Sequence, residues 1–283
     1  MTRWLSLLFA FLAVQITASE FEVLKGEIAH YQEALKTSES EQLHYDLALA
    51  YFHDQEIDKA FRHFLLALKE AEAKEMPKIE EVEKNRYDEA LAYYLDQSGS
   101  NPICVASELV KRYADVDEGN IELRLLIATA YANLGQYDLF FKHFYDTYPY
   151  LKDSFLAYKI QGILYLRLSH HSRLAEQRHA FQQEALDYLS EALDLCPNDA
   201  SLYKVLMFLA KNEKNDSLIQ SCLQKMADNR APIARGDIYL YVRESVRLGE
   251  YEVGQKIIDH ASLLYDYSRA IAAAQDYLNQ HKG

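Results

Sequence analysis

The chain has 283 residues, enough for one large domain or two small ones with a sizeable buried core. Apolar residues make up 49% and charged residues 26%, as in ordinary folded proteins, and only 9 glycines and 5 prolines interrupt the chain. So few helix breakers favour long helices over a many-turned sheet. The formal net charge of −13 argues against nucleic acid or an anionic membrane surface as a partner of the whole molecule.

The first residues differ in character from the rest. Arg3 gives a short positive start, residues 4–18 are apolar with few interruptions, and residues 17–19 (Thr-Ala-Ser) are small, as a signal peptidase requires. The apolar run is too short to span a bilayer comfortably, and no later segment is apolar enough to do so. We predict a cleaved secretory signal peptide over 1–19 and a periplasmic or secreted domain over 20–283. A buried first helix or a retained anchor is the alternative.

A helix–turn–helix pattern recurs along the rest of the chain. Segments 45–68 and 125–148 both run from a small residue to a tyrosine, then a polar turn, then a second apolar helix with an aromatic face. Units of this kind begin near residues 41, 87, 121, 155, 200 and 235, so successive starts are 46, 34, 34, 45 and 35 residues apart. The two longer gaps hold insertions, at 75–86 between units and at 169–179 inside the fourth unit.

The landmark residues of these units resemble those of the tetratricopeptide repeat, a 34-residue helix–turn–helix unit. In the first unit they are Leu47, Ala48, Tyr51, Ala60, Phe64 and Ala67, and in the third Ile127, Ala128, Tyr131, Phe140, Phe144 and Thr147. No unit has the large tryptophan of the family pattern. The resemblance covers roughly 41–267 and implies an all-α solenoid of about six repeats. Segment 20–37 is then an orphan helix before the first pair, and 268–282 a capping helix after the last.

The segment DLCPNDA (194–200) has two interpretations, a reactive cysteine or a joint between helices. Pro197 stands at the closing place of a repeat, and Asn198 and Asp199 are suited to cap the next helix. No base or second thiol lies beside Cys196 in sequence, so we favour the joint. We expect the three cysteines, Cys104, Cys196 and Cys222, to be small buried residues, and Cys196 with Cys222 is the pair to test for a disulfide.

Patterns of catalysis are missing from the sequence. It contains no glycine-rich phosphate loop, nucleophile elbow, CxxC or HExxH. His170, His171 and His179 form a loose group, but no third and fourth ligands stand at a metal-site spacing. We therefore predict no catalytic residue, no cofactor and no metal, and keep a metal enzyme that uses this histidine group as a minor alternative.

The resemblance also implies where a partner binds, because the inner groove of such solenoids is lined mainly by the first helix of each pair. Carried onto this chain, it gives a peptide-binding groove in the C-terminal half. The expected groove residues are Lys159, Arg167, Lys204, Phe208, Lys211, Tyr239, Arg243 and Arg247. Some family members clamp a peptide carboxylate with lysine and asparagine. Lys159 and Lys204 match the lysine, but Ile163 and Phe208 stand where asparagine is required, so the full clamp is absent.

Arg243 and Arg247 lie four residues apart and therefore share a helix face. Clustered cations bind carboxylates through charge-assisted hydrogen bonds, so we expect an acidic or extended peptide as the partner. The alternative is that the groove cations pair with carboxylates of neighbouring helices. The resemblance thus implies a non-enzymatic protein-interaction scaffold of the cell envelope or secretory space, with a chaperone or holdase for an exported client as the alternative. No feature of the sequence identifies the partner or the oligomeric state.

Overall fold

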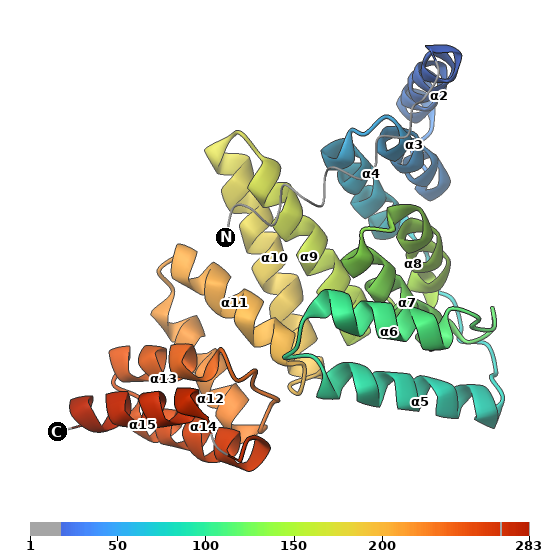
Figure 1. Ribbon diagram of the computed structural model, residues 1–283. Coiled ribbons are helices and arrows are strands. Elements are labelled where there is room, and N and C mark those ends of the chain that lie inside the picture. The colour runs from blue at the N-terminus through green and yellow to red at the C-terminus, as the bar shows by residue number, and fades with distance from the viewer. Residues whose placement is uncertain (1–17, 267, 283) are drawn as a thin grey trace.

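The computed structural model describes residues 18–266 and 268–282, and within them every regular element is an α-helix (Figure 1). The predicted signal peptide lies outside these residues except for its last two. The helices are α2 (Ala18–Thr37), α3 (Glu41–His53), α4 (Ile57–Glu70), α5 (Glu81–Asp96), α6 (Pro102–Tyr113), α7 (Ile121–Leu134), α8 (Tyr137–Leu151), α9 (Phe155–His171), α10 (Ala175–Leu195), α11 (Ala200–Asn212), α12 (Asp216–Asp228), α13 (Ile238–Arg247), α14 (Tyr251–Leu264) and α15 (Arg269–His281). The all-α prediction is confirmed for this part of the chain.

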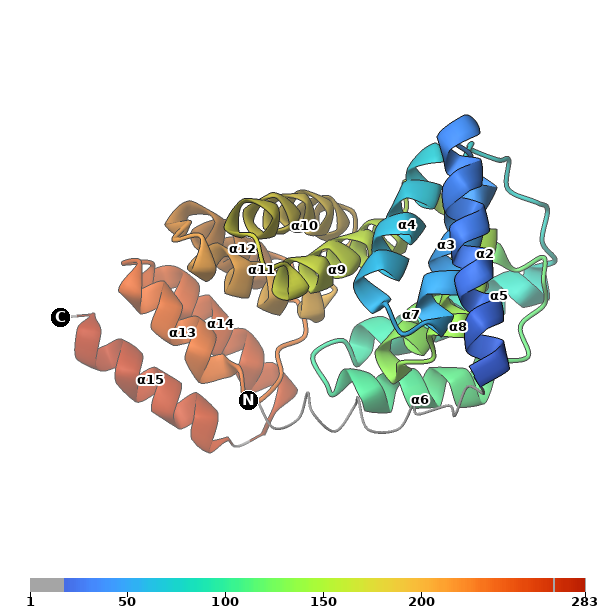
Figure 2. The ribbon, with the colours of Figure 1, turned by 90° about the horizontal axis from the view of Figure 1, so that it is seen from above.

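Most helices pack with their neighbour in sequence as antiparallel pairs, joined by short polar turns. Four of the predicted units begin where a helix begins, at α3, α7, α9 and α11. In each case the residue before the helix caps it, because its side-chain oxygen accepts a hydrogen bond from a backbone N–H of the first turn. The caps are Ser40, Asn120, Ser154 and Asp199. Helices α2 and α15 occupy the ranges predicted for terminal helices and lie toward opposite ends of the molecule (Figure 2).

The α5–α6 pair interrupts the simple order of packing. Helix α4 packs on α8 and α9, whereas α5 and α6 pack on α7. The chain between α4 and α5 crosses α8 without helical structure, and the backbone N–H of Lys74 donates to the Pro149 carbonyl at 2.8 Å. The insertion predicted over 75–86 is therefore partly this crossing and partly the first turns of α5. Because of this crossing, the α5–α6 pair packs on α7 and not on α4.

The apolar core forms two clusters. The first extends from α2 to α9 and contains five buried phenylalanines, with the ring of Phe64 4.6–5.8 Å from the rings of Phe140, Phe141 and Phe144. The second extends from α10 to α15, and Tyr203 is its largest fully buried side chain. Helix α9 faces both clusters. We call the boundary along α9 and α10 the seam.

A histidine pair in the first cluster makes stability depend on pH. His44 Nδ1 lies 3.0 Å from His63 Nδ1, so one of these nitrogens must accept and the two rings cannot both be protonated there. Burial, and then the nearby His44, lowers the pKa of His63 to about 4.

Acidification should therefore weaken the fold. Unfolded His63 binds a proton below its ordinary pKa of about 6.5, whereas folded His63 does so only near 4, so the unfolded state is favoured as pH falls across this window. We expect His63 to account for a loss of roughly 2 kcal/mol, reduced for its partial exposure. Urea unfolding of wild type and His63→Asn at pH 7 and 4.5 measures it, with exposed His179→Asn as control. Equal pH dependence in wild type and His63→Asn would contradict the assignment.

Candidate functional site

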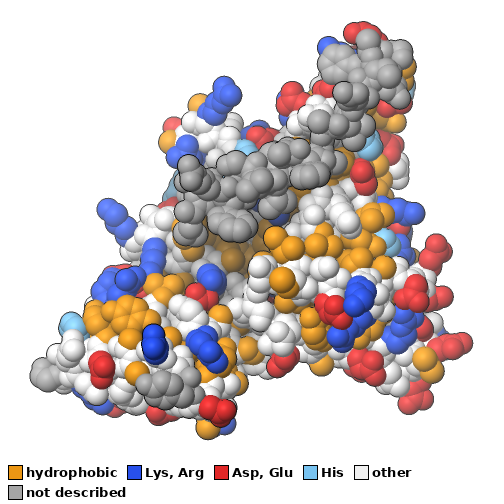
Figure 3. Space-filling view, viewed as in Figure 1, with side chains coloured by type: hydrophobic (Ala, Val, Ile, Leu, Met, Phe, Trp, Pro, Cys, Tyr) orange, Lys and Arg blue, Asp and Glu red, His pale blue; other side chains and the backbone are white. Residues whose placement is uncertain are grey.

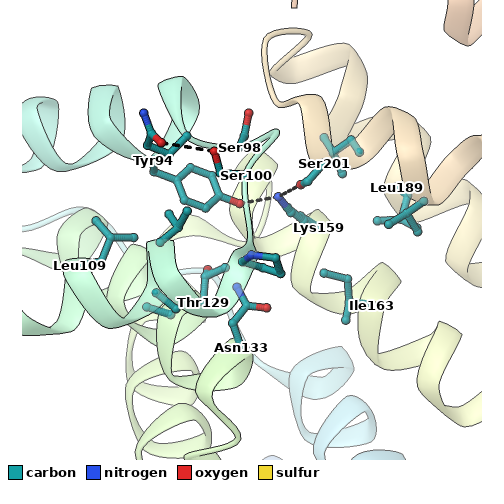
Figure 4. Close-up of a pocket in the computed structure, with 17 residues that line it drawn as sticks. Tyr94, Ser98, Ser100, Leu109, Thr129, Asn133, Lys159, Ile163, Leu189 and Ser201 are labelled. Carbon is teal, nitrogen blue, oxygen red and sulfur yellow. Dashed lines mark hydrogen bonds between the residues drawn. The ribbon is translucent and has the colours of Figure 1, made fainter. Parts of the chain in front are cut away.

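A cavity of about 190 Å³ lies at the seam, between the α5–α6 pair and the helices α7, α9, α10 and α11 (Figure 4). Its apolar walls are formed by Pro102, Val105, Ala106, Leu109, Ala130, Ile163, Leu189, Leu202 and Val205. Polar groups reach it from Tyr94, Gln97, Ser98, Ser100, Thr129, Asn133, Lys159 and Ser201. A mostly apolar cavity with a few polar groups, set between two cores, is the usual form of a binding site.

Lys159 lies beside the cavity in a buried polar network. Its ammonium donates to the Tyr94 hydroxyl, to Asp199 Oδ2 at 2.5 Å and to Ser201 Oγ at 2.6 Å, which uses all three N–H groups. The Lys159 side chain is 7% exposed and that of Asp199 is 0% exposed. Tyr94 also donates to Asp199 Oδ2, at 3.3 Å. We call these four residues the seam network, because they join α5, α9 and the start of α11.

The seam network holds fixed charges. Burial by itself lowers the pKa of Lys159, but Asp199 and then Tyr94 raise it above its usual range. Burial, and then Asp199, raises the pKa of the Tyr94 phenol. Near neutral pH the lysine is therefore an ammonium and the tyrosine a neutral phenol. A general acid or base works best with a pKa close to the ambient pH, so neither of these groups is suited to proton transfer.

The network corrects one sequence prediction and extends another. Lys159 was expected to face a bound peptide, but its ammonium is buried and fully hydrogen-bonded. Asp199 was expected to cap a helix, and its Oδ1 does accept from the Ser201 N–H at 3.0 Å. Its second oxygen neutralises Lys159, which the sequence analysis missed. The capping position was the available signal, since a cap aspartate at a buried joint must find a partner for its charge.

Three of the other expected groove cations pair with carboxylates of neighbouring helices. Lys204 lies 2.8 Å from Asp237 and Lys211 lies 2.7 Å from Glu244, and both pairs join α11 to α13. Arg247 bonds to Glu244 at 2.9 Å and to Asp216 of α12 at 2.6 Å. These contacts match the alternative in which the cations bind neighbouring helices.

Arg167 also has a structural environment. Its guanidinium donates to the Tyr137 hydroxyl and lies over the rings of Tyr137 and Phe61, 5.3 and 6.0 Å from their centroids. Burial lowers its pKa. Arg167 thus joins α9 to α8 and α4.

The three remaining groove residues are exposed and make no hydrogen bond with their side chains among the described residues. Phe208 of α11 is 49% exposed and Tyr239 of α13 is 36% exposed. The Arg243 side chain is 48% exposed and its guanidinium has an ion pair with Glu244 at 3.5 Å but no hydrogen bond in the described part of the chain. We call Phe208, Tyr239 and Arg243 the α11–α13 face. Figure 3 shows hydrophobic and basic side chains side by side over this end of the molecule.

Charge is unbalanced on the α11–α13 face. The buried Glu244 carboxylate is shared by Lys211, Arg247 and Arg243. Burial by itself raises the pKa of Glu244, but hydrogen bonds from Lys211 and Arg247 bring it below its usual range. The Glu244 carboxylate thus forms ion pairs with three cations. Among the described residues, Arg247 alone of the three has a second carboxylate partner, Asp216. Arg243 is left able to bind another carboxylate.

The cysteines and the histidine group have separate surroundings. Cys196 and Cys222 are buried free thiols, whereas Cys104 is exposed, so the prediction that all three are buried is wrong for Cys104. His171 lies 3.8 Å from Asp58 and His179 lies 3.3 Å from Glu213, so these two histidines have separate partners. Across residues 18–266 and 268–282, no three histidine, cysteine or acidic side chains converge as metal ligands.

Helices long and apolar enough to cross a membrane are not found among the described residues. Comparison with known protein families and with curated proteins finds no match for this chain. The functional assignment therefore depends on the site itself.

Proposed function

We propose that the chain is a tetratricopeptide-like solenoid of about six helix pairs that acts as a protein-interaction scaffold in the periplasm or outside the cell. Two features support the repeat. Four predicted unit starts coincide with capped helix starts. The Lys204–Asp237 and Lys211–Glu244 pairs each join residues 33 apart, as expected for equivalent helices one repeat unit apart. The displaced α5–α6 pair is a departure from the regular pattern.

The α11–α13 face is the observation that carries the interaction role. The other groove cations have partners within the protein. Phe208 and Tyr239 each meet one ring, that of His170 and that of Tyr277, yet both stay exposed, and Arg243 has no hydrogen bond among the described residues. Aromatic and arginine side chains contribute most of the energy at protein interfaces. Guanidinium groups bind carboxylates through paired, charge-assisted hydrogen bonds. An acidic peptide segment with apolar side chains is the partner that this chemistry favours.

Photo-crosslinking from the α11–α13 face tests the proposal. A photoreactive phenylalanine analogue placed at Phe208 in the full chain should capture one partner in the producing cells, which mass spectrometry then identifies. The same analogue at Leu195, which is 54% exposed at the end of α10, is the control and should capture little. Many unrelated captured proteins would instead favour the holdase. Equal capture from both positions would contradict a binding role for this face.

Arg243→Glu should reduce capture from position 208 by about tenfold, because it replaces a charge-assisted hydrogen bond with repulsion. The Lys211–Glu244–Arg247 contacts do not depend on Arg243, so the fold should be retained, as circular dichroism can check. Arg112→Glu is a matched control, since that guanidinium on α6 is similarly exposed, at 50%. A similar loss with both variants would show that net charge matters and the α11–α13 face does not.

A further inference from the structure

We infer that the seam cavity is an anchor site for one uncharged apolar side chain of the bound peptide, with the Asn133 amide hydrogen-bonding to the peptide backbone beside it. This inference rests on the proposed function, because it specifies which part of the partner the scaffold recognises. The seam cavity and the α11–α13 face then form one binding surface with two subsites, one apolar and one basic.

The cavity has no charge to offer a ligand. Lys159 is the charged residue in its wall, and all three of its N–H groups are bonded to protein oxygens. The Thr129 hydroxyl donates to the Leu125 carbonyl at 3.1 Å, and Ser100 Oγ donates to Gln97 Oε1 at 3.3 Å. A charged side chain entering this space would lose its hydration without gaining a counter-ion. An apolar one would replace water against apolar walls, which is favourable.

Asn133 is the polar group left without a partner. It is half-buried on α7, it lines the cavity, and its side-chain amide has no hydrogen bond within the described residues. Figure 4 shows it on the same side as Thr129 and Ile163, across from the Ser98 and Ser201 side. An asparagine amide carries both donors and an acceptor, which is the complement of a peptide group. It is therefore suited to hold the backbone of a segment whose side chain fills the cavity.

Two helices, α9 and α11, lead from the cavity toward the α11–α13 face. On α11, Ser201 and Val205 line the cavity, and Phe208 follows at the spacing that keeps residues on one side of a helix. On α9, Ile163 lines the cavity and His170, two turns later, meets the edge of the Phe208 ring. A segment anchored in the cavity therefore extends past Phe208 toward Arg243. The excess of cations there favours a carboxylate further along the same segment.

Capped single amino acids are the probes for the anchor site. N-acetyl-leucinamide and N-acetyl-phenylalaninamide present one apolar side chain between two peptide groups, and N-acetyl-alaninamide and N-acetyl-aspartic acid amide are their small and charged controls. With ¹⁵N-labelled full chain, titration should shift the Asn133 side-chain amide signal, assigned by its loss in Asn133→Asp. Saturable shifts are expected with the leucine and phenylalanine probes alone. No shift, or equal shifts with all four, would mean that the cavity is only a packing void.

Filling the cavity tests its role in partner capture. Ala130→Leu and Ala106→Leu each place a larger side chain in the wall, and we expect each to abolish the probe shifts and to reduce capture from position 208 at least tenfold. Ala227→Leu overpacks a buried site on α12 outside the cavity and should leave both unchanged. Asn133→Asp, at a half-buried position, should keep the fold and reduce capture, and it decides the outcome if the leucine variants do not fold.

The results of these experiments distinguish failure of the anchor site from failure of the proposed interaction role. Normal capture by the filled variants, together with loss in Arg243→Glu, would overturn the anchor site and leave the interaction role standing. Failure of position 208 to capture any partner would overturn the proposed function, whatever the probes show. Reduced capture in both kinds of variant is the result expected if peptide, cavity and α11–α13 face act together.

Discussion

Lys159→Met is expected to lower the free energy of unfolding by about 3–5 kcal/mol, because it leaves the Asp199 carboxylate buried without its counter-ion. The carboxylate is 0% exposed, and its other contacts are neutral donors from Tyr94 and Ser201. Methionine fills similar space without supplying a charge. Urea unfolding of the full chain measures the change as a lower transition midpoint.

The double variant Lys159→Met, Asp199→Asn separates charge from packing. Asparagine still caps α11, since its side-chain oxygen can accept from the Ser201 N–H in place of Asp199 Oδ1. Removing both charges should therefore recover a large part of the stability lost in the single variant. A double variant no more stable than Lys159→Met would show that the ammonium is needed for its hydrogen bonds and not for its charge.

Gly162→Ala is expected to cost about 1–3 kcal/mol, although alanine is the better helix former. A β-carbon at Gly162 would lie 2.5 Å from Leu189 Cγ and 3.2 Å from the Ala185 carbonyl oxygen, so α10 has to move away from α9. These helices form the seam, and Leu189 also lines the cavity. The loss should therefore appear both in urea unfolding and in weaker binding of the leucine probe.

Gly26→Ala is the matched control for Gly162→Ala. Gly26 also lies inside a helix, α2, but a β-carbon there meets no atom within 4 Å. Alanine at this position should raise the free energy of unfolding by about 0.5–1 kcal/mol through helix propensity alone. Opposite signs at the two glycines are the expected result. A stabilising effect at both would mean that α9 and α10 approach less closely than described.

Four of the predicted unit starts fall on helix starts, and the causes of such starts are local, whereas the helices expected near 87 and 235 begin at Glu81 and Ile238. A cap such as Ser154 and its first-turn N–H lie within a few residues of each other, so the pattern alone locates the start of α9. The position of the α5–α6 pair was not predictable in the same way. It depends on the crossing after α4 and on its contact with Pro149, and no local periodicity encodes either.

The candidate site shows the same division between local pattern and distant contact. Helical spacing predicts that Lys204 and Lys211 share one side of their helix, but it does not indicate that Asp237 and Glu244 bind them. Tyr94 and Asp199 reach Lys159 from 65 and 40 residues away in sequence. Spacing can place a side chain on a face of a helix. Whether that side chain is free to bind a partner depends on which charged residues, distant in sequence, the fold brings into contact with it.

The double role of Asp199 limits how the chain can be divided. A fragment ending at Pro197 would contain the whole first core together with α9 and α10. No helix pair would be cut, because Pro197 lies between α10 and α11. It would nevertheless leave Lys159 without its counter-ion and uncover the apolar residues of α10 that pack in the second core. The C-terminal part would in turn begin with α11 and a cap carboxylate that has lost its lysine. Asp199 therefore links the two parts of the chain by charge where α9 and α10 already link them by packing, and expression of either part alone should give a poorly folded product.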